Sequence, residues 1–225
     1  MVVGLPKGVM DTNIIPVEVS NRHVHLSKEH VEVLFGKGYI LKQARPLSQP
    51  GEFAAEEKVR LVNGNKVING VRIIGPERAV TQVELSGTDA AQLGMDVPLR
   101  LSGDIEGTPG ITIEGPVGSV VLGTGVIRAK RHVHLSEDDA RQLGLVDGAS
   151  VSIILLGGEE TGIILDDLIV RVGKNYSRAA HVDVDEWNVL GVEGESCSVT
   201  RRTVNKVCSA FLLNKGSLSE QDGKH

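Results

Sequence analysis

The hexapeptide RHVHLS occurs twice, at Arg22–Ser27 and at Arg131–Ser136, and it holds four of the seven histidines of the chain. Residues two apart in a β-strand project from the same face, about 6.6 Å apart along the strand. An HxH pair at a strand end can therefore offer both imidazoles to one metal ion, whereas a helix would turn them to nearly opposite sides. Both pairs follow an apolar, β-like segment. A single HxH pair would favour surface histidines instead, so the repetition matters.

Each HxH pair leads directly into a predicted short helix that starts at a serine and stops at a glycine. These helical segments lie within Leu26–Gly36 and Leu135–Gly144. The second segment also has Asp139 three residues after its capping serine, which is the capping-box spacing. The same order of candidate ligand, apolar residue, Ser or Asp cap, helix and Gly recurs at Glu84–Gly94 and His181–Gly191. The sequence thus predicts an internal duplication, with two such patterns in each half.

The fourfold pattern supplies one further ligand to each HxH pair. Three protein ligands leave a coordination position open, which is typical of a catalytic rather than a structural metal. Two matched sets favour metal binding over surface histidines, and we assign the remaining His30 and His225 to solvent. The two predicted sets are His23, His25 and Glu84, and His132, His134 and His181.

The segments between turns predict a mainly β fold. They are short and rich in Val, Ile and Leu, as in KVRLV, VRIIG and SVSIILL, and 27 glycines separate them. Such a pattern is typical of barrels or sandwiches with few helices. Aromatic residues make up only 3% of the chain, so aliphatic side chains must fill the core.

Two polar residues outside the ligand sets point to phosphate. Arg78 lies in a Gly-Pro turn six residues before Glu84, and guanidinium groups bind phosphate oxygens with paired hydrogen bonds. The alternative is a surface arginine paired with Glu77. Ser102 lies in the glycine-rich loop RLSGDIEGTPG, which can hold an anion, although most such loops are hairpins.

Composition excludes several classes of protein. A net charge of −5 over 225 residues argues against general affinity for nucleic acid. The sequence has neither a long apolar run nor a signal peptide, so we expect no membrane partner and a soluble, intracellular protein. Cys197 and Cys208 have no CxxC partner, so we expect inert, reduced thiols.

The order of the motifs resembles the PduL-type family of phosphate acyltransferases (phosphotransacylases, or phosphate propanoyltransferases). The resemblance covers residues 14–199 and is highly specific. The motifs that carry it are IPVEVSNRHVHLS, QPGEFAAEEKV, VRIIGPERAVTQVELSGTDA, PLRLSGDIEGTPGI, GVIRAKRHVHLS and HVDVDEWN. Family members interchange acyl-CoA plus phosphate with acyl phosphate plus CoA, typically for propanoyl or acetyl groups. The resemblance implies this acyltransferase activity, with acyl-CoA or CoA and phosphate or acyl phosphate as partners.

The resemblance also implies an architecture and roles for the site. It implies two similar β-barrels capped by short helices, with a dinuclear zinc site between them. One zinc would lie on each ligand set, Arg78 would be the catalytic and phosphate-binding group, and Ser102 would also bind phosphate. Another divalent ion fits the same donors. One zinc would hold the CoA sulfur as a thiolate while phosphate attacks the thioester directly, without an acyl-enzyme.

The implied domains involve an exchange of the first strand. Residues 22–129 would form the first barrel, and residues 14–21 would join residues 130–200 in the second. Residues 201–225 would be a C-terminal tail; disorder, a short added helix and a changed reading frame are three open alternatives for it.

The cellular setting follows from the start of the chain and from general tendencies. Microcompartment members of the family, such as those of propanediol degradation, usually carry an amphipathic N-terminal extension. The residues before Ile14 show no clear apolar stripe. We therefore expect a cytoplasmic enzyme of acetate or propionate metabolism rather than one in a microcompartment lumen, and a homodimer or higher homo-oligomer.

Two other functions remain open from the residues alone. A dinuclear zinc hydrolase could use the same ligands to activate water. A zinc-stabilised barrel could instead serve only as a binding or shell-associated module. Thiol release from acyl-CoA with and without phosphate separates the three functions.

Overall fold

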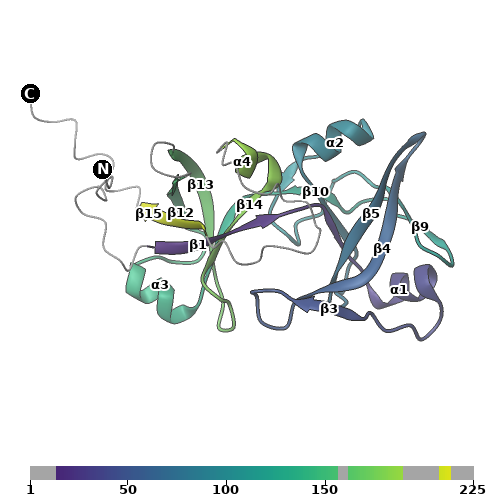
Figure 1. Cartoon of the computed structure of the whole chain (residues 1–225), viewed down its shortest axis with the longest axis horizontal. Coiled ribbons are helices and arrows are strands. Elements are labelled where there is room, and N and C mark those ends of the chain that lie inside the picture. Colours follow the sequence, from purple (N-terminus) through teal and green to yellow (C-terminus); the bar gives the residue numbers. More distant parts are fainter. Residues whose placement is uncertain (1–13, 157–161, 190–207, 214–225) are drawn as a thin grey trace, which may run out of the picture. The chain divides into compact units, whose positions relative to one another are not determined.

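The computed structural model describes residues 14–156, 162–189 and 208–213 (Figure 1). Among these residues, no helix combines the length and apolarity needed to cross a membrane.

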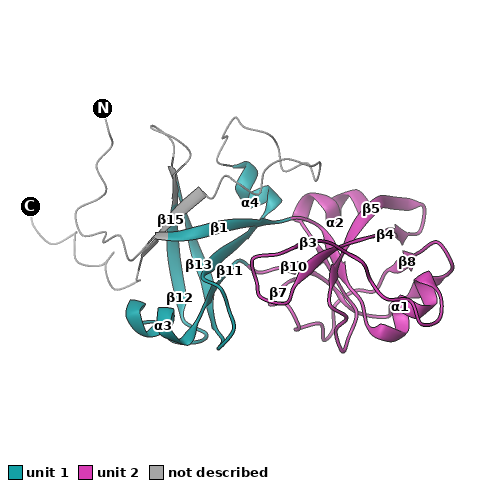
Figure 2. Ribbon diagram, turned by 60° about the horizontal axis from the view of Figure 1, so that its bottom comes forward, with its two compact units in different colours: residues 1–20, 131–225 teal, residues 21–130 magenta. Residues whose placement is uncertain are grey.

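The chain divides into two compact units, which Figure 2 shows in different colours. Unit 1 comprises residues 1–20 and 131–225, and unit 2 comprises residues 21–130. The strand before the first RHVHLS word therefore packs with the C-terminal part of the chain, and the word itself begins within unit 2. The resemblance placed the boundaries at residues 21/22 and 129/130, one residue away from each of these.

The described part of unit 1 consists of six strands and two short helices. They are β1 (Ile14–Ser20), β11 (His132–Leu135), α3 (Glu137–Leu143), β12 (Ser150–Leu156), β13 (Gly162–Val172), β14 (Ala179–Asp183), α4 (Val184–Asn188) and β15 (Cys208–Leu213). The strands form a closed barrel in the order β1-β14-β11-β13-β12-β15. In this barrel β11 runs antiparallel to β14 and parallel to β13.

One strand of this barrel corrects the prediction of a C-terminal tail over 201–225. Residues Cys208–Leu213 form β15, which pairs antiparallel with both β1 and β12. The backbone groups of β15 complete the ladder between these two strands, so closure leaves them no open edge. The rest of the expected tail lies outside the described residues.

The described part of unit 2 is a nine-stranded sheet with two helices. Its elements are β2 (His23–His25), α1 (Lys28–Phe35), β3 (Gln43–Pro46), β4 (Phe53–Asn63), β5 (Lys66–Gly75), β6 (Gln82–Leu85), α2 (Gly87–Leu93), β7 (Leu99–Arg100), β8 (Thr112–Glu114), β9 (Ser119–Val121) and β10 (Val126–Ala129). The order is β7-β10-β6-β2-β5-β4-β8-β9, with β3 beside β4. The described strands thus confirm a mainly β fold, with a closed barrel in unit 1 and a curled sheet in unit 2.

Aliphatic residues fill the core of each unit, as the low aromatic content predicted. Strand alternation sends one face of each strand into this core. In β2 and β11 the central valines, Val24 and Val133, are fully buried in the two cores. The histidines on either side of each valine consequently project from the other face of the strand.

All four predicted helix caps are present. The side chains of Ser27, Ser86, Ser136 and Asp183 each accept a hydrogen bond from the backbone N–H of the third helical residue. Reciprocal capping boxes form in α2 and α4. In α3 the carboxylate of Asp139 instead accepts a hydrogen bond from the Ser136 hydroxyl. Each cap ends a ligand-bearing strand and turns the chain at once into a helix.

The predicted glycine stops hold for three helices. Gly94 and Gly144 adopt the left-handed conformation after α2 and α3, and Gly36 has a φ of 111° after α1. A positive φ favours glycine over other residues, which explains these stops. Helix α4 already ends at Asn188, and the predicted stop at Gly191 lies outside the described residues.

Candidate metal centres

Antiparallel strand pairs bring both predicted ligand sets together. In unit 2, β2 lies beside β6 with His23 opposite Glu84. In unit 1, β11 lies beside β14 with His132 opposite His181. The second histidine of each pair projects from the same face two residues later. Within each of the two sets, the candidate ligand atoms lie within 4.8 Å of one another.

In the unit 2 set, hydrogen bonding orients the first imidazole. Nδ1 of His23 lies 2.7 Å from the carbonyl oxygen of Asn21. A carbonyl can only accept, so Nδ1 carries the proton and Nε2 presents its lone pair. This Nε2 lies 3.1 Å from Nε2 of His25 and 3.5 Å from Oε2 of Glu84. A carbonyl that fixes the tautomer in this way is the usual outer partner of a metal-bound histidine.

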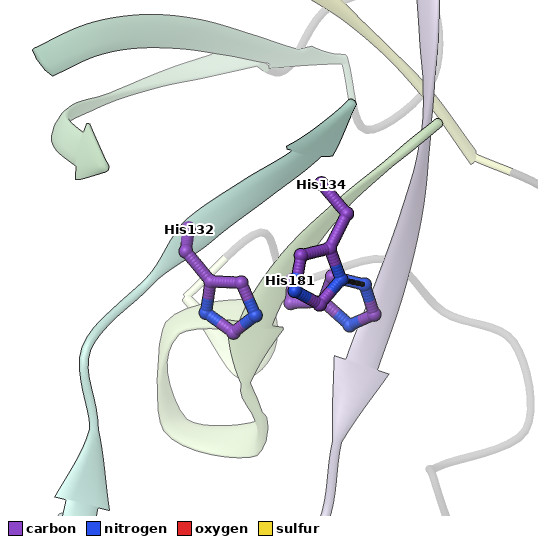
Figure 3. A group of neighbouring side chains, drawn as sticks. All are labelled: His132, His134 and His181. Atoms are coloured by element: carbon purple, nitrogen blue, oxygen red, sulfur yellow. Dashed lines mark hydrogen bonds between the residues drawn. The ribbon is translucent and has the colours of Figure 1, made fainter. Parts of the chain in front are cut away.

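In the unit 1 set, three imidazoles converge (Figure 3). Nδ1 of His134 lies 3.2 Å from Nε2 of His181, the contact drawn as a dashed line. The rings of His132 and His181 stack with their centroids 4.9 Å apart. Nε2 of His134 is buried without a hydrogen-bond partner among the described residues. A buried nitrogen of this kind normally has a partner, so the set is incomplete as a hydrogen-bonded cluster.

The spacing of these nitrogens fits a tetrahedral metal. Two nitrogens bound to one zinc at 2.0–2.1 Å lie about 3.3 Å apart. The closest nitrogen pairs measure 3.1 Å in unit 2 and 3.2 Å in unit 1. Two neutral imidazoles this close can share only one proton, whereas a cation between them satisfies both lone pairs. Imidazole and carboxylate donors suit zinc and several other divalent ions.

Burial keeps one histidine of each set neutral. The pKa of His25 is well below its usual value, first because of burial and then because of the charges of His23 and Arg78. The pKa of His134 is lowered to about 3, first because the side chain is buried and then because of the charges of His132 and Arg171. A metal ligand must be unprotonated, so both side chains can bind a cation at neutral pH without first losing a proton.

The two predicted phosphate-binding residues of unit 2 are joined by a hydrogen bond. Nη1 of Arg78 donates to Oγ of Ser102 at 3.2 Å, and this hydroxyl donates to Oε1 of Glu84 at 2.9 Å. The other guanidinium nitrogen, Nη2, donates to Glu52 at 2.9 Å. The alternative drawn from the sequence, pairing with the neighbouring Glu77, is thus replaced by an ion pair with a distant glutamate. A continuous chain of contacts links the guanidinium to the carboxylate of the candidate metal set.

Gln82, which no motif in the sequence singled out, organises this chain of contacts. Its buried amide nitrogen donates to Oε1 of Glu84 at 2.6 Å and to Oγ of Ser102 at 2.9 Å. Its carbonyl oxygen accepts from the backbone N–H of Gly103 at 2.7 Å. The one available signal was its position two residues before Glu84 on the same strand, which puts both side chains on one face.

The assignment of His30 to solvent is wrong. Nδ1 of His30 lies 2.7 Å from the hydroxyl oxygen of Thr81, and the side chain is half-buried. His30 is the third residue of α1, and Thr81 directly precedes β6, so the contact joins the helix to the strand that carries Glu84. The remaining histidine, His225, lies outside the described residues.

A surface pocket of about 440 Å³ lies beside Arg78 within unit 2. None of the candidate metal ligands lines it. Its walls come from the start of α1 and from the segment before β6, and they include the cationic side chains of Lys28 and Arg78. The carboxylate of Glu29 lines it as well, so the pocket places charges of both signs beside Arg78.

Known proteins resemble this chain over most of its length. The sequence model of the phosphate propanoyltransferase family matches residues 16–193. A phosphate propanoyltransferase of Thermotoga maritima is 49% identical over 174 residues, covering 77% of this chain and 82% of the relative. Relatives of the same name from Leptotrichia buccalis and Salmonella typhimurium are 47% and 42% identical, covering 78% and 80% of this chain and 82% and 84% of theirs. The chain belongs to the phosphate propanoyltransferase family.

Proposed function

We propose that this chain is a phosphate acyltransferase that interconverts acyl-CoA plus phosphate with acyl phosphate plus CoA. Propanoyl-CoA is the first acyl donor to test, because the relatives of this chain carry the name phosphate propanoyltransferase. Acetyl-CoA is the second. The observation that carries the proposal is the chain of hydrogen bonds from Arg78 through Ser102 to Glu84, which joins a phosphate-binding group to a candidate metal ligand.

Each ligand set holds one zinc ion in this proposal. Zinc bound to three protein ligands keeps a position open, acts as a Lewis acid and stabilises an anionic oxygen or sulfur. The support is the nitrogen spacing in both sets. Cobalt or another divalent ion suits the same donors, so metal analysis of the purified protein belongs in the first experiment.

Arg78 and Ser102 bind the phosphate. The guanidinium offers donors in a planar fork that matches two phosphate oxygens. Ser102 adds a hydroxyl, and Gln82 fixes this hydroxyl by donating to its oxygen. Because Glu52 already holds one edge of the guanidinium, an incoming phosphate meets an arginine that is fixed in place. The same positive charge stabilises the negative charge that develops on the reacting carbonyl.

The transfer is direct in this proposal. A phosphate oxygen attacks the thioester carbonyl carbon and forms a C–O bond, the C–S bond breaks, and the CoA sulfur leaves with its electron pair as a thiolate. The reverse reaction begins with the thiolate and acyl phosphate. Neither Cys197 nor Cys208 lies in the sequence motifs that hold the ligand sets, Arg78 and Ser102, so we propose no covalent acyl carrier.

We also propose that the two units derive from an internal duplication into related β-barrels. Both units place an HxH strand antiparallel to a strand with the third ligand, and both follow each ligand strand with a capped helix. The further strands differ between the units, so the resemblance is concentrated at the ligand strands. Superposition of the four strand-cap-helix segments on one another tests the duplication.

Thiol release from propanoyl-CoA and acetyl-CoA, measured with and without phosphate, tests the function. Release that depends on phosphate, with acyl phosphate as product, supports the transferase. Release at the same rate without phosphate would instead show a hydrolase. A protein that holds two zinc ions and releases no thiol would point to a binding module, and the proposal would fail.

A further inference from the structure

The arginine that begins each RHVHLS word makes the same contact in both units. In unit 2, Nη1 of Arg22 pairs with Oδ1 of Asp89. In unit 1, Nη1 of Arg131 pairs with Oε1 of Glu186 at 2.6 Å. Each arginine directly precedes the first histidine of a ligand set, and each acid is the third residue of the helix that follows the third ligand.

Both acids also belong to the reciprocal capping boxes. Asp89 accepts a hydrogen bond from the backbone N–H of Ser86 and donates its own N–H to the Ser86 hydroxyl. Glu186 and Asp183 exchange the corresponding bonds at 2.9 and 2.8 Å. The cap lies two residues after the third ligand. A continuous path therefore runs from the first histidine through the arginine, the helix acid and the cap back to the third ligand.

A second contact joins the opposite end of each ligand-strand pair. In unit 2, His30 of α1 contacts Thr81, directly before β6. In unit 1, Asp139 of α3 pairs with Arg178, directly before β14, at 3.8 Å. The third residue of each helix thus reaches the strand partner of its own ligand strand. The two short strands that carry the ligands are tied together beyond both ends of their ladder.

We propose that Arg22 and Arg131 are positioning residues for the metal sites, each acting on the site of its own unit. The unit 2 ligand ladder has three registered pairs, as does that of unit 1, so backbone pairing alone holds few residues in place. Metal affinity depends on ligand atoms being held near their bound geometry before the ion arrives. The arginine-acid pair limits sliding and splaying of the strands where the first and third ligands face each other.

The burial of these pairs supports an ordering role. The side chain of Arg22 is 40% exposed but its partner Asp89 is only 2% exposed, and those of Arg131 and Glu186 are 31% and 22% exposed, so each pair has at least one largely buried member. Exposed ion pairs order little, because water screens them. A matched contrast is available in each unit: Arg60 pairs with Glu114 in unit 2, and Arg141 pairs with Asp138 in unit 1, and all four of these side chains are more than a third exposed.

The inference rests on the proposed zinc sites, and the test uses the full chain with Zn²⁺ alone as the probe. The sites are observed singly, in a His134→Ala background for unit 2 and a His25→Ala background for unit 1. Zinc affinity of the metal-free protein is measured by competition with a chromophoric chelator. Absorption of bound Co²⁺ reports the coordination geometry of each site independently of activity. The variants are Arg22→Gln and Arg131→Gln, with Arg60→Gln and Arg141→Gln as controls.

We expect Arg22→Gln to weaken zinc binding in unit 2 about tenfold and to leave unit 1 unchanged, with the reverse for Arg131→Gln. The cobalt spectrum should change only in the affected unit, and neither control should alter binding. Equal losses at both sites, or affinities within about twofold of the parent at both, would overturn the proposal. A parent protein that binds no zinc would instead refute the proposed metal sites themselves.

A second set of variants tests the same proposal if the glutamine variants fold poorly. Arg22→Lys keeps the charge but lacks the planar fork, so an intermediate loss of affinity is expected. Asp89→Asn keeps an oxygen for the cap and removes the ion pair, and Arg22→Gln combined with Asp89→Asn should be no worse than either alone. Losses that simply add in the double variant would show that the two residues act separately, against the proposal.

Discussion

The two candidate metal centres share a backbone arrangement, and among the ladder positions at which they differ is the one opposite the second histidine. Opposite His25 in unit 2 lies Gln82, and opposite His134 in unit 1 lies Ala179. The glutamine holds Glu84, Ser102 and the following backbone N–H in one network. Alanine cannot form hydrogen bonds with its side chain.

The surroundings of the second histidine differ accordingly. Against His134 lies the ring of Tyr176, with the two ring centroids 4.2 Å apart. His25 instead shares its set with a carboxylate that accepts two hydrogen bonds on Oε1, while Oε2 faces His23. A carboxylate can contact a metal with one oxygen and a polar network with the other. In the proposed function, this difference would couple metal to phosphate in unit 2, whereas in unit 1 the nearby carboxylate is that of Glu18, 3.8 Å from Nδ1 of His181.

Loss of a ligand should have the largest effect and should be similar in the two units. His25→Ala and His134→Ala each leave two of three ligands, so each protein should retain one zinc of two. Phosphate-dependent thiol release should fall at least about 100-fold in both variants, because the altered site of each variant then lacks its Lewis acid. Elemental analysis and the thiol assay measure the two effects. Full activity in either single-zinc protein would show that one centre is dispensable and would break the comparison.

Removal of the guanidinium from unit 2 should separate the centres. Arg78→Ala should lower the phosphate-dependent rate about 100-fold and leave zinc content at two, because it removes charge stabilisation without touching a ligand. Arg171→Ala is the matched control, since the charge of Arg171 likewise lowers the pKa of a buried histidine, His134. It should lower the rate less than about threefold. Equal losses in the two variants would mean that both centres carry an anion-binding group.

A substitution at the ladder position opposite His25 should have a smaller effect than the loss of Arg78. Gln82→Ala makes unit 2 resemble unit 1 at this position and releases Ser102 and Glu84 from a shared donor. We expect about a tenfold loss in kcat/KM, chiefly as a raised KM for phosphate, with zinc still bound. Gln82→Glu keeps the size but removes the donor, and it should not restore activity. Unchanged kinetics in both variants would show that the network does not position the phosphate site.

The ligand strands and their helices could be predicted because their signals are local. Two-residue alternation placed the histidines of each HxH pair on one face, and Ser or Asp caps with glycine stops marked the helices. Antiparallel pairing then brought Glu84 opposite His23 and His181 opposite His132, as the fourfold pattern required. The metal itself stays a prediction, as do the phosphate-binding roles of Arg78 and Ser102.

What the sequence did not predict depends on pairing between distant segments. Strand β15 pairs with β1, almost 200 positions earlier, and nothing in its own composition specifies that partner. The contact of Arg78 with Glu52 likewise depends on how separate loops meet, so the neighbouring Glu77 looked equally suitable. His30 lacked a visible partner because Thr81 is 51 residues away. These contacts depend on how distant segments pair in the folded chain, and hydrophobic periodicity carries no information about that pairing.

The smallest expected effect is the pH dependence of the stability of the metal-free protein. It depends on the buried histidine of each ligand set. An unfolded histidine has a pKa of about 6.5, whereas folding lowers that of His134 to about 3. The unfolded chain therefore binds a proton that the folded chain refuses, and stability is lost as the pH falls below about 6.5 toward 3. Above this window the residue contributes no pH dependence.

Between pH 7.5 and 5.5 the free energy of unfolding should drop by about 1 kcal/mol through His134, and His134→Gln should remove that part of the drop. The midpoint of urea unfolding at the two pH values measures it. His25→Gln should act in the same direction, because burial also lowers the pKa of His25. Zinc should raise the stability of the parent protein without abolishing the drop, since a metal-bound histidine also refuses the proton that the unfolded chain accepts. A drop that survives both substitutions would assign the acid sensitivity to other groups and leave the buried histidines without this role.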